Sequence, residues 1–375
     1  MLSTPAPPTA RTTRRPFAAR VANAGRRTAR FASRNRTVVF FLLFLVLADT
    51  GFGLFAPLWG RYSPDDYTSR IRACAERPRD VVYVGGSPVA EGIDPAALAG
   101  VPWRGRPLND GYAVGLSGGT STDFYYATKL ACPVPPRVLV YGITASDLND
   151  ARGEPHGART LLAPRDLVEV MRTRPDAAEW TARHYLEGKF GRVSNVYHYR
   201  HAFRMWAATR ADALAPGSCP EALRDATNQR EHADDLTSPT GYAPLRGYAL
   251  RRWDRMKAAG VRPPFKYLDK FRTGSHLRYV YKLADWCADH GVELVLVDMP
   301  VTTDWESENA AAFAEYRVRL AEVERERGLK VIRGGRDGAG LTDEHFADLI
   351  HLTPPGCHTF NAWLRGKLEE AGRTP

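Results

Sequence analysis

Apolar residues in this 375-residue chain gather in short runs, which alternate with longer stretches of helical spacing. The runs at 81–84, 138–142, 292–297 and 330–332, and a strand end that enters a glycine-rich turn over 113–120, predict buried strands. The stretches 63–78, 121–130, 275–290 and 305–328 have the spacing of helices. Strands that alternate with helices predict an α/β domain over 63–375: a doubly wound, parallel five-stranded sheet with its site at the strand C-termini.

Residues 151–270 interrupt this alternation. They are rich in arginine and aromatic residues, and they read as mostly helical to about 215 and irregular from there to 270. We interpret them as a helical insertion that caps the domain beside or over the site. The cluster at 198–201 (His-Tyr-Arg-His) is compatible with a metal or a polyanionic glycan. We favour packing, because histidines and aromatic residues on a helix mostly pack.

An almost uninterrupted apolar segment lies near the N-terminus. The segment 37–59 carries one charge, at Asp49, and has the length of about 20 residues that a bilayer-spanning helix needs. Residues 1–36 contain nine arginines and no acid, which predicts a disordered tail that stays in the cytoplasm while everything after residue 60 is exported. A signal-peptidase site at 46–48 and a faint twin-arginine pattern at 13–17 are alternatives. We favour a retained single-pass anchor in the cell membrane.

The tail also accounts for the basic character of the chain. Of 52 lysines and arginines, 43 lie outside it, against 42 acidic residues, so the net charge of +10 falls to about zero for the remainder. This balance gives no support to nucleic-acid binding by the folded part.

The five cysteines lack the paired spacing of a zinc site, so no metal is predicted. Buried, unpaired thiols are the default interpretation for most of them. Cys74 and Cys132 each follow a helix and precede a strand, and strands one and three are neighbours in the expected sheet. A disulfide between Cys74 and Cys132 is therefore an alternative in an oxidising compartment.

A serine follows the first predicted strand, in the sequence Val-Val-Tyr-Val-Gly-Gly-Ser-Pro over 81–88. The two glycines permit a sharp turn, Ser87 stands where a helix N-cap is expected, and Pro88 fits the first helical position. A serine on such a turn is presented at the C-terminal end of a strand, in the positive field of a helix N-terminus. Taken alone, Ser87 is more simply a capping residue.

A second motif, 264 residues later, favours a catalytic role for Ser87 over a capping role. Asp348 and His351 lie three residues apart in the sequence Asp-Leu-Ile-His-Leu-Thr-Pro-Pro-Gly. The carboxylate at this spacing can hold one imidazole nitrogen, which leaves the other free to accept a proton from a serine. Ser87, His351 and Asp348 are therefore the candidate nucleophile, base and orienting carboxylate.

The order and context of these motifs resemble the SGNH (GDSL-like) hydrolase family, whose fold is a flavodoxin-like parallel sheet. The family's second block matches residues 113–118, with Ala113 in place of its asparagine, and implies that Gly118 donates its backbone N–H to the oxyanion. The third block falls on 142–145 and places Thr144 where the family has an asparagine. Asn149 is the next candidate for that donor. Since losing one oxyanion donor costs about 10²–10³ in rate, this departure weakens the expectation of strong hydrolase activity.

The same departure, with an anchor and an inserted helical region, resembles one branch of that superfamily. This branch includes the D-alanine transfer protein of teichoic acids and the alginate O-acetylation proteins. The resemblance implies an anchored serine esterase or O-acyltransferase that acts on acylated cell-envelope polysaccharide or on a small acyl ester. It implies no cofactor, and a membrane-bound acyltransferase is the expected partner. The alternative is a catalytically silent module that binds glycan or scaffolds an envelope complex.

Overall fold

A computed structural model of the protein describes residues 35–59, 67–152, 157, 160–215, 238–245, 250, 254, 258 and 268–373. The chain divides into two units, Met1–Ala56 and Pro57–Pro375. In the first unit, helix α2 (Arg36–Leu54) has 19 residues, none of them buried. Its length and apolar composition suit it to cross a membrane, a property that signal sequences share. The short helix α3 (Ala56–Trp59) follows.

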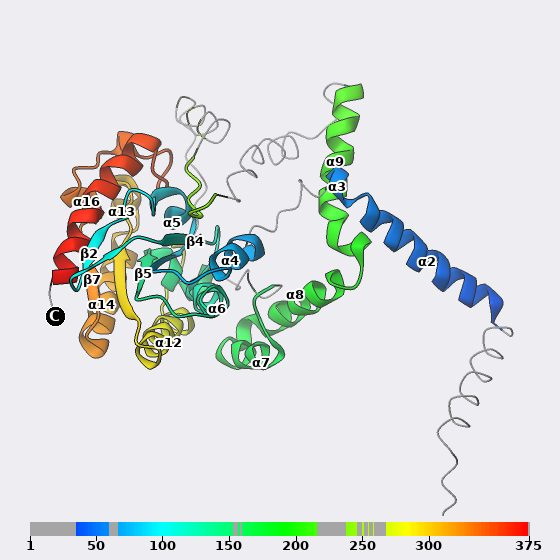
Figure 1. Ribbon diagram of the computed structural model, residues 1–375, viewed down its shortest axis with the longest axis horizontal. Coiled ribbons are helices and arrows are strands. Elements are labelled where there is room, and N and C mark those ends of the chain that lie inside the picture. The colour runs from blue at the N-terminus through cyan, green and yellow to red at the C-terminus, as the bar shows by residue number, and fades with distance from the viewer. Residues whose placement is uncertain are drawn as a thin grey trace, which may run out of the picture. The chain divides into compact units, whose positions relative to one another are not determined.

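Five parallel strands form the centre of the second unit (Figure 1). They are β1 (Val81–Gly85), β4 (Gly111–Gly115), β5 (Val138–Ile143), β6 (Glu293–Asp298) and β7 (Lys330–Ile332). Their spatial order is β4-β1-β5-β6-β7, and every pairing is parallel. Counted along the chain this is the order 2-1-3-4-5, so the predicted doubly wound, flavodoxin-like sheet is confirmed.

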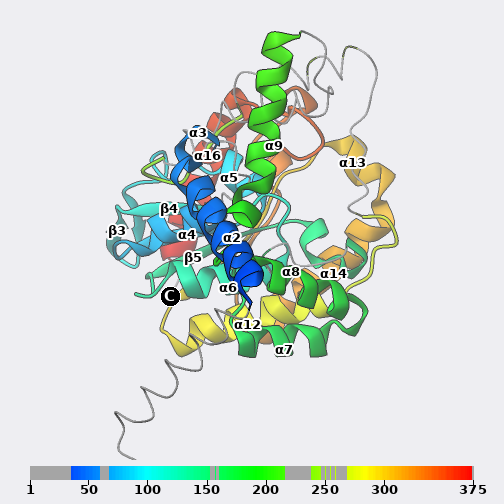
Figure 2. The same cartoon turned by 90° about the vertical axis from the view of Figure 1, so that its right-hand side faces the viewer.

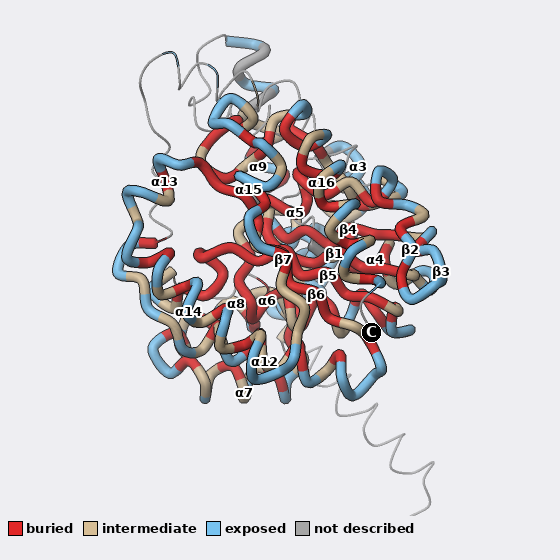
Figure 3. The backbone as a smooth tube through the Cα atoms, turned by 90° about the vertical axis from the view of Figure 1, so that its left-hand side faces the viewer, coloured by how far each residue is buried: buried red, intermediate tan, exposed pale blue. Residues whose placement is uncertain are grey.

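Alternate residues of the strands pack into two separate cores, one on each face of the sheet, and the strands are buried along most of their length (Figure 3). Val82 and Val84 of β1 face the core covered by α4 (Tyr67–Ala75), α6 (Ser121–Ala131), α12 (Ser275–Asp289) and α14 (Ala310–Arg327). Val81 and Tyr83 face the other core, covered by α5 (Ser87–Gly92) and α16 (Pro354–Arg373). Burial on both faces explains why the strands read as continuous apolar runs.

Three glycines lie side by side across the sheet where α5 packs. In the strand register, Gly85 of β1 stands opposite Gly115 of β4 and Gly142 of β5. A Cβ atom at Gly115 would lie 2.3 Å from that of Ala90, and one at Gly142 would lie 2.4 Å from the side chain of Val89. The absence of side chains in this row therefore lets α5 lie directly on the strands, at their C-terminal ends.

Two short 3₁₀ turns, η2 (Ala145–Leu148) and η3 (Asp150–Arg152), lead from β5 into the insertion. The described part of the insertion contains the helices α7 (Pro164–Thr173), α8 (Ala178–Gly191) and α9 (Asn195–Leu214), with the 3₁₀ turn η5 (Pro175–Ala177) between α7 and α8. Helices therefore occupy most of the described residues from 164 to 214, the stretch that the sequence analysis expects to be mostly helical. The segments 216–237 and 259–267, which the prediction had as irregular, lie outside the described residues.

A buried polar chain ties the start of the insertion to the sheet domain. Arg174, 2% exposed, follows α7 and donates to Nε2 of His276 at 2.9 Å, and Nδ1 of His276 lies 3.1 Å from the hydroxyl of Thr122 on α6. Both carboxylate oxygens of Asp150 accept backbone N–H groups at the start of α12, from Ser275 and His276. Helix α7 accordingly lies close to α12 and α6 in two perpendicular views (Figures 1 and 2).

Residues 238–245 return to the sheet and cover part of its β4 edge. The N–H of Ala113 donates to the carbonyl of Thr240 at 2.8 Å, and the N–H of Ala243 donates to the carbonyl of Ala90 in α5, also at 2.8 Å. Gly241 has φ +72°, and a Cβ atom there would lie 2.2 Å from the carbonyl oxygen of Ala113. The segment thus satisfies backbone groups at an edge strand that would otherwise be open.

Two local elements differ from the sequence prediction. A hairpin of β2 (Val101–Trp103) and β3 (Arg106–Leu108) was not predicted, because its turn is Arg-Gly and both strands contain proline. Arg104 and Gly105 both have positive φ, as two-residue hairpin turns of type I′ require. The predicted helix over 305–328 is two helices, α13 (Thr303–Glu308) and α14, which meet at Asn309. The short elements α15 (Gly335–Gly338) and η7 (Asp343–His345) follow β7.

The cysteine prediction has a mixed outcome. Cys74 and Cys132 are neighbours, as the sheet order implied, and their thiols are hydrogen-bonded to each other, but both are free and buried. The alternative of a Cys74–Cys132 disulfide is therefore not found in the structure. Cys287 and Cys357 are also buried free thiols, and Cys219 lies outside the described residues.

We expect the substitution Gly115→Ala to force α5 away from the sheet. Overpacking of this kind costs about 1–3 kcal/mol of unfolding free energy, and the displacement would move Ser87 as well. Denaturant unfolding measures the first effect. The matched control is Gly366→Ala, on an exposed face of α16 with nothing within 4 Å of the new methyl group, which should stabilise by about 0.5–1 kcal/mol. Equal stability of Gly115→Ala and wild-type protein would contradict the packing role.

Candidate active site

Ser87 lies between the C-terminal end of β1 and the sheet-packed helix α5. It is the first residue of α5 and Pro88 the second, because Gly86, with an extended conformation, is the N-cap. The prediction that Ser87 itself is the N-cap is therefore wrong by one position. The two glycines before it allow the tight path that was expected, and the hydroxyl is left for a contact outside the helix.

The loop that carries Asp348 and His351 is closed by its own backbone. Phe346 and Leu352 form an antiparallel bridge, and both side chains are buried in the core that contains α5. The N–H of Ala347 donates to the carbonyl of His351 at 2.8 Å. This closure brings the 348–351 loop to the C-terminal edge of the sheet, beside Ser87.

Asp348 uses its two carboxylate oxygens for different purposes. Oδ1 accepts the backbone N–H groups of Ile350 and His351, each at 2.8 Å, which fixes the turn. Oδ2 lies 2.6 Å from Nδ1 of His351 and so sets the orientation of the ring. The opposite nitrogen, Nε2, lies 2.7 Å from the hydroxyl of Ser87. The structure therefore brings the three residues into one hydrogen-bonded series across 264 positions of sequence.

This arrangement has the geometry that general-base activation of a hydroxyl requires. The nucleophile and base are within hydrogen-bond reach, and a third group orients the base. The Asp348 side chain is fully buried and that of His351 is 12% exposed, so the pair is shielded from water while Ser87 keeps partial access. The arrangement is suited to acyl transfer through a serine ester.

Burial and neighbouring charge oppose one another in setting the pKa of His351. Burial lowers it, but the carboxylates of Asp348 and Glu91 outweigh burial and raise the pKa of His351 to about 9. Burial likewise raises the pKa of Asp348, and the facing imidazole with the two loop N–H groups outweighs burial, so the pKa of this carboxyl lies below its usual value. The resting pair is therefore an ion pair near neutral pH.

Two of the predicted oxyanion donors lie on turns at the same edge of the sheet. Gly118 follows β4 in a turn with φ +75°, so the local requirement for glycine is met. Thr144 follows β5 as the N-cap of η2, and its hydroxyl lies 2.8 Å from that of Ser146. The Thr144 hydroxyl is thus already engaged within its own turn. Donation to an oxyanion by Gly118 or Thr144 stays a prediction.

Asn149 has a structural use that the sequence did not reveal. Its side-chain oxygen accepts the N–H groups of Ala151 and Arg272, both at 3.1 Å, and its amide nitrogen donates to the carbonyl of Asp269 at 3.4 Å. The side chain is fully buried. These contacts hold the end of the insertion against the sheet domain and engage the side chain. Donation to an oxyanion by Asn149 stays a prediction.

Sequence reasoning missed Arg152, which bridges the turns after β4 and β5. Its guanidinium donates to the carbonyl of Gly119 at 3.1 Å and lies 3.8 Å from the carboxylate of Asp147. Burial raises the pKa of Asp147 to about 6, against the lowering effect of Arg152. Because the arginine lies in a short 3₁₀ turn, no periodic pattern in the sequence marked it.

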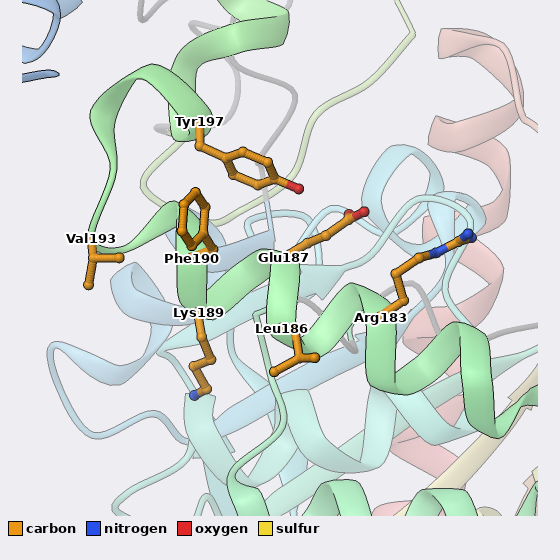
Figure 4. A pocket seen from close by; sticks show the side chains of 7 residues that line it. All are labelled: Arg183, Leu186, Glu187, Lys189, Phe190, Val193 and Tyr197. Atoms are coloured by element: carbon orange, nitrogen blue, oxygen red, sulfur yellow. The ribbon is translucent and has the colours of Figure 1, made fainter. Parts of the chain in front are cut away.

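A cavity of about 790 Å³ lies elsewhere, between α8 and α9, among mainly apolar side chains (Figure 4). None of the predicted site residues lines it. On the neighbouring part of α9, His198 packs edge-on against Tyr199, with ring centroids 4.5 Å apart, in line with the packing interpretation of that cluster. The side chain of His201 lies outside the described residues. Within the described ranges, no group of three His, Cys, Asp or Glu side chains could hold a metal ion.

Comparisons with known proteins do not assign this chain to a family. No family model and no curated protein matches the chain. A solved structure from Bacteroides fragilis, provisionally named an acylhydrolase, aligns over 81% of this chain and 95% of its own, with 12% identity and a TM-score of 0.33. A likeness at this level does not bear on the activity of this chain, which must be inferred from its own residues.

Reaction at Ser87 should depend on pH through His351. The imidazole accepts the serine proton only when it is neutral, so the rate of modification by a fluorophosphonate should rise with pH, with its midpoint near pH 9. Labelling rates of the full-length protein in detergent between pH 6 and 10 measure this. A rate that is already level at pH 7 would show that the two carboxylates do not hold the ring in its charged form.

Proposed function

We propose that the chain is a membrane-anchored serine esterase or O-acyltransferase that acts on acyl esters of cell-envelope polysaccharide. The observation that carries the proposal is the series Ser87–His351–Asp348, with contacts of 2.7 and 2.6 Å. A plain capping serine needs no imidazole, and a surface Asp/His pair needs no buried carboxylate. The resemblance of the surrounding motifs to SGNH hydrolases supports the acyl-ester substrate class.

In the first step, Oγ of Ser87 attacks the carbonyl carbon of an acyl ester and transfers its proton to Nε2 of His351. The carbonyl oxygen becomes negatively charged and is stabilised by the backbone N–H groups of Ser87 and Gly118. When the tetrahedral intermediate collapses, the ester C–O bond breaks and the alcohol leaves with the proton from Nε2. The acyl group then remains on Ser87.

In the second step, a new hydroxyl group attacks the acyl-serine while Nε2 of His351 accepts its proton. The bond between the acyl carbon and Oγ of Ser87 then breaks, and Oγ takes the proton from Nε2. Water as the attacking group gives a carboxylic acid, and the overall reaction is hydrolysis. A sugar hydroxyl as the attacking group gives a new ester, and the overall reaction is acyl transfer. Both routes return Ser87 and His351 to their starting state, so they differ only in which acceptor the site admits.

Export of the catalytic domain is part of the same proposal. The nine arginines in residues 1–36 favour retention of the N-terminus in the cytoplasm, and α2 is suited to span the bilayer. Alkaline phosphatase fused after residue 62 should therefore be active. An inactive phosphatase fusion together with an active cytoplasmic reporter at the same position would reverse the assigned orientation.

The catalytic role is tested by substitution of the proposed nucleophile. Ser87→Ala should abolish both fluorophosphonate labelling and turnover of a short p-nitrophenyl ester, since no attacking oxygen remains. The matched control is Ser307→Ala, an exposed serine whose hydroxyl donates only to its own helix, and it should react like wild type. Wild-type turnover by Ser87→Ala would refute the proposal. A wild-type protein that is never labelled would favour the silent, glycan-binding alternative.

A further inference from the structure

Helix α5 directs two groups at the same nitrogen of His351. The hydroxyl of Ser87 lies 2.7 Å from Nε2, and a carboxylate oxygen of Glu91 lies 3.7 Å from it. The two residues are four positions apart, so they lie on one side of the helix, a single turn from each other. No motif in the sequence marks Glu91.

The position of Glu91 is fixed by contacts on two sides of α5. The backbone carbonyl of Glu91 accepts the thiol of Cys357 in α16 at 3.1 Å. The preceding residue, Ala90, accepts the N–H of Ala243 from the segment that covers the sheet edge. The carboxylate side chain is 19% exposed, and the His351 side chain that it faces is 12% exposed. Glu91 is thus a partly buried charge held beside the ring, and little solvent is available to screen it.

The carboxylates of Asp348 and Glu91 lie on opposite sides of the His351 imidazole ring. Asp348 contacts Nδ1 from the ring's own loop, and Glu91 approaches Nε2 from α5. Among the described residues, Cys357 of α16 donates its thiol to the Glu91 carbonyl and is hydrogen-bonded to Tyr242, so both are further titratable groups near Glu91. Burial raises the pKa of the Cys357 thiol to about 12, so this group stays neutral over the working range. Both charges that act on the imidazole are therefore negative.

We propose that Glu91 is a positioning residue that holds His351 as an imidazolium in the resting enzyme, and thereby sets how far the pH must rise before Ser87 can be activated. The proposal rests on the function proposed above. When Ser87 attacks, its proton moves to Nε2 and the ring becomes positive, so Glu91 stabilises the charge that forms in that step. The same charge reduces the share of neutral base available at the start. Activity is thus restrained at neutral pH and released as the pH rises.

The test compares wild type with Glu91→Gln, which keeps the size of the side chain and removes its charge. Loss of an opposite charge at this distance lowers the pKa of a histidine by about one unit or more. The midpoint of the pH–labelling curve should therefore move down by about one unit, and the variant should react up to about tenfold faster at pH 7. Glu344→Gln, an exposed residue near the same loop, removes an equal charge elsewhere and should leave the curve unchanged.

A second readout does not depend on catalysis. Titration of the His351 ring by NMR of histidine-labelled full-length protein, assigned by its loss in His351→Gln, should show the same downward shift in Glu91→Gln. Should this variant fail to fold, Glu91→Asp decides, because its carboxylate is withdrawn by one methylene group. Its midpoint is expected between those of Glu91→Gln and wild type.

The outcomes separate this inference from the proposed function. An unchanged ring titration in a folded Glu91→Gln protein, or an unchanged midpoint in Glu91→Asp, overturns the role of Glu91 even where Ser87 is labelled normally. Conversely, a shifted titration in a protein that is never labelled keeps the role of Glu91 in holding the imidazolium and overturns the catalytic proposal.

Discussion

The seating of α5 on the row Gly85, Gly115 and Gly142 is the constraint on which the candidate site depends. Any side chain in this row would meet the helix or a neighbouring carbonyl. The helix in turn carries Ser87 at its first residue and Glu91 one turn later. Because one six-residue helix carries both groups, the position of each above the sheet is set by the packing of α5 on the strands. The precision of the site therefore originates in three positions that have no side chain.

The second partner, the 348–351 loop, is fixed independently of the first. Its ends are paired through Phe346 and Leu352, and these side chains enter the same core that receives α5. The hydrophobic effect that buries this core therefore also stabilises the contact between α5 and the 348–351 loop. Ser87 and His351 meet as a result of packing that involves neither of their polar atoms, so their mutual hydrogen bond is a consequence of the fold and not its cause.

The sequence predicted the parts of this molecule that local chemistry determines. Short, mostly apolar β-forming runs marked the strands, and the Gly-Gly-Ser turn and Asp-x-x-His spacing identified residues that the fold brings into contact. Features that depend on distant contacts were missed. Asn149 looked available as a donor, yet its amide is occupied by backbone groups more than 100 residues away. Glu91 was not identified from the sequence, because nothing local shows which face of α5 meets His351.

The double use of the Asp348 carboxylate has a consequence for how such chains diverge. One oxygen shapes the turn and the other orients the imidazole, so loss of this residue would disturb the loop even in a descendant that had abandoned catalysis. Selection for folding alone would then keep the aspartate in place long after the reaction was lost. Among related chains, an aspartate at this position can thus be conserved for folding alone. Loss of the hydroxyl at position 87 would be the earlier sign that a chain no longer catalyses the reaction.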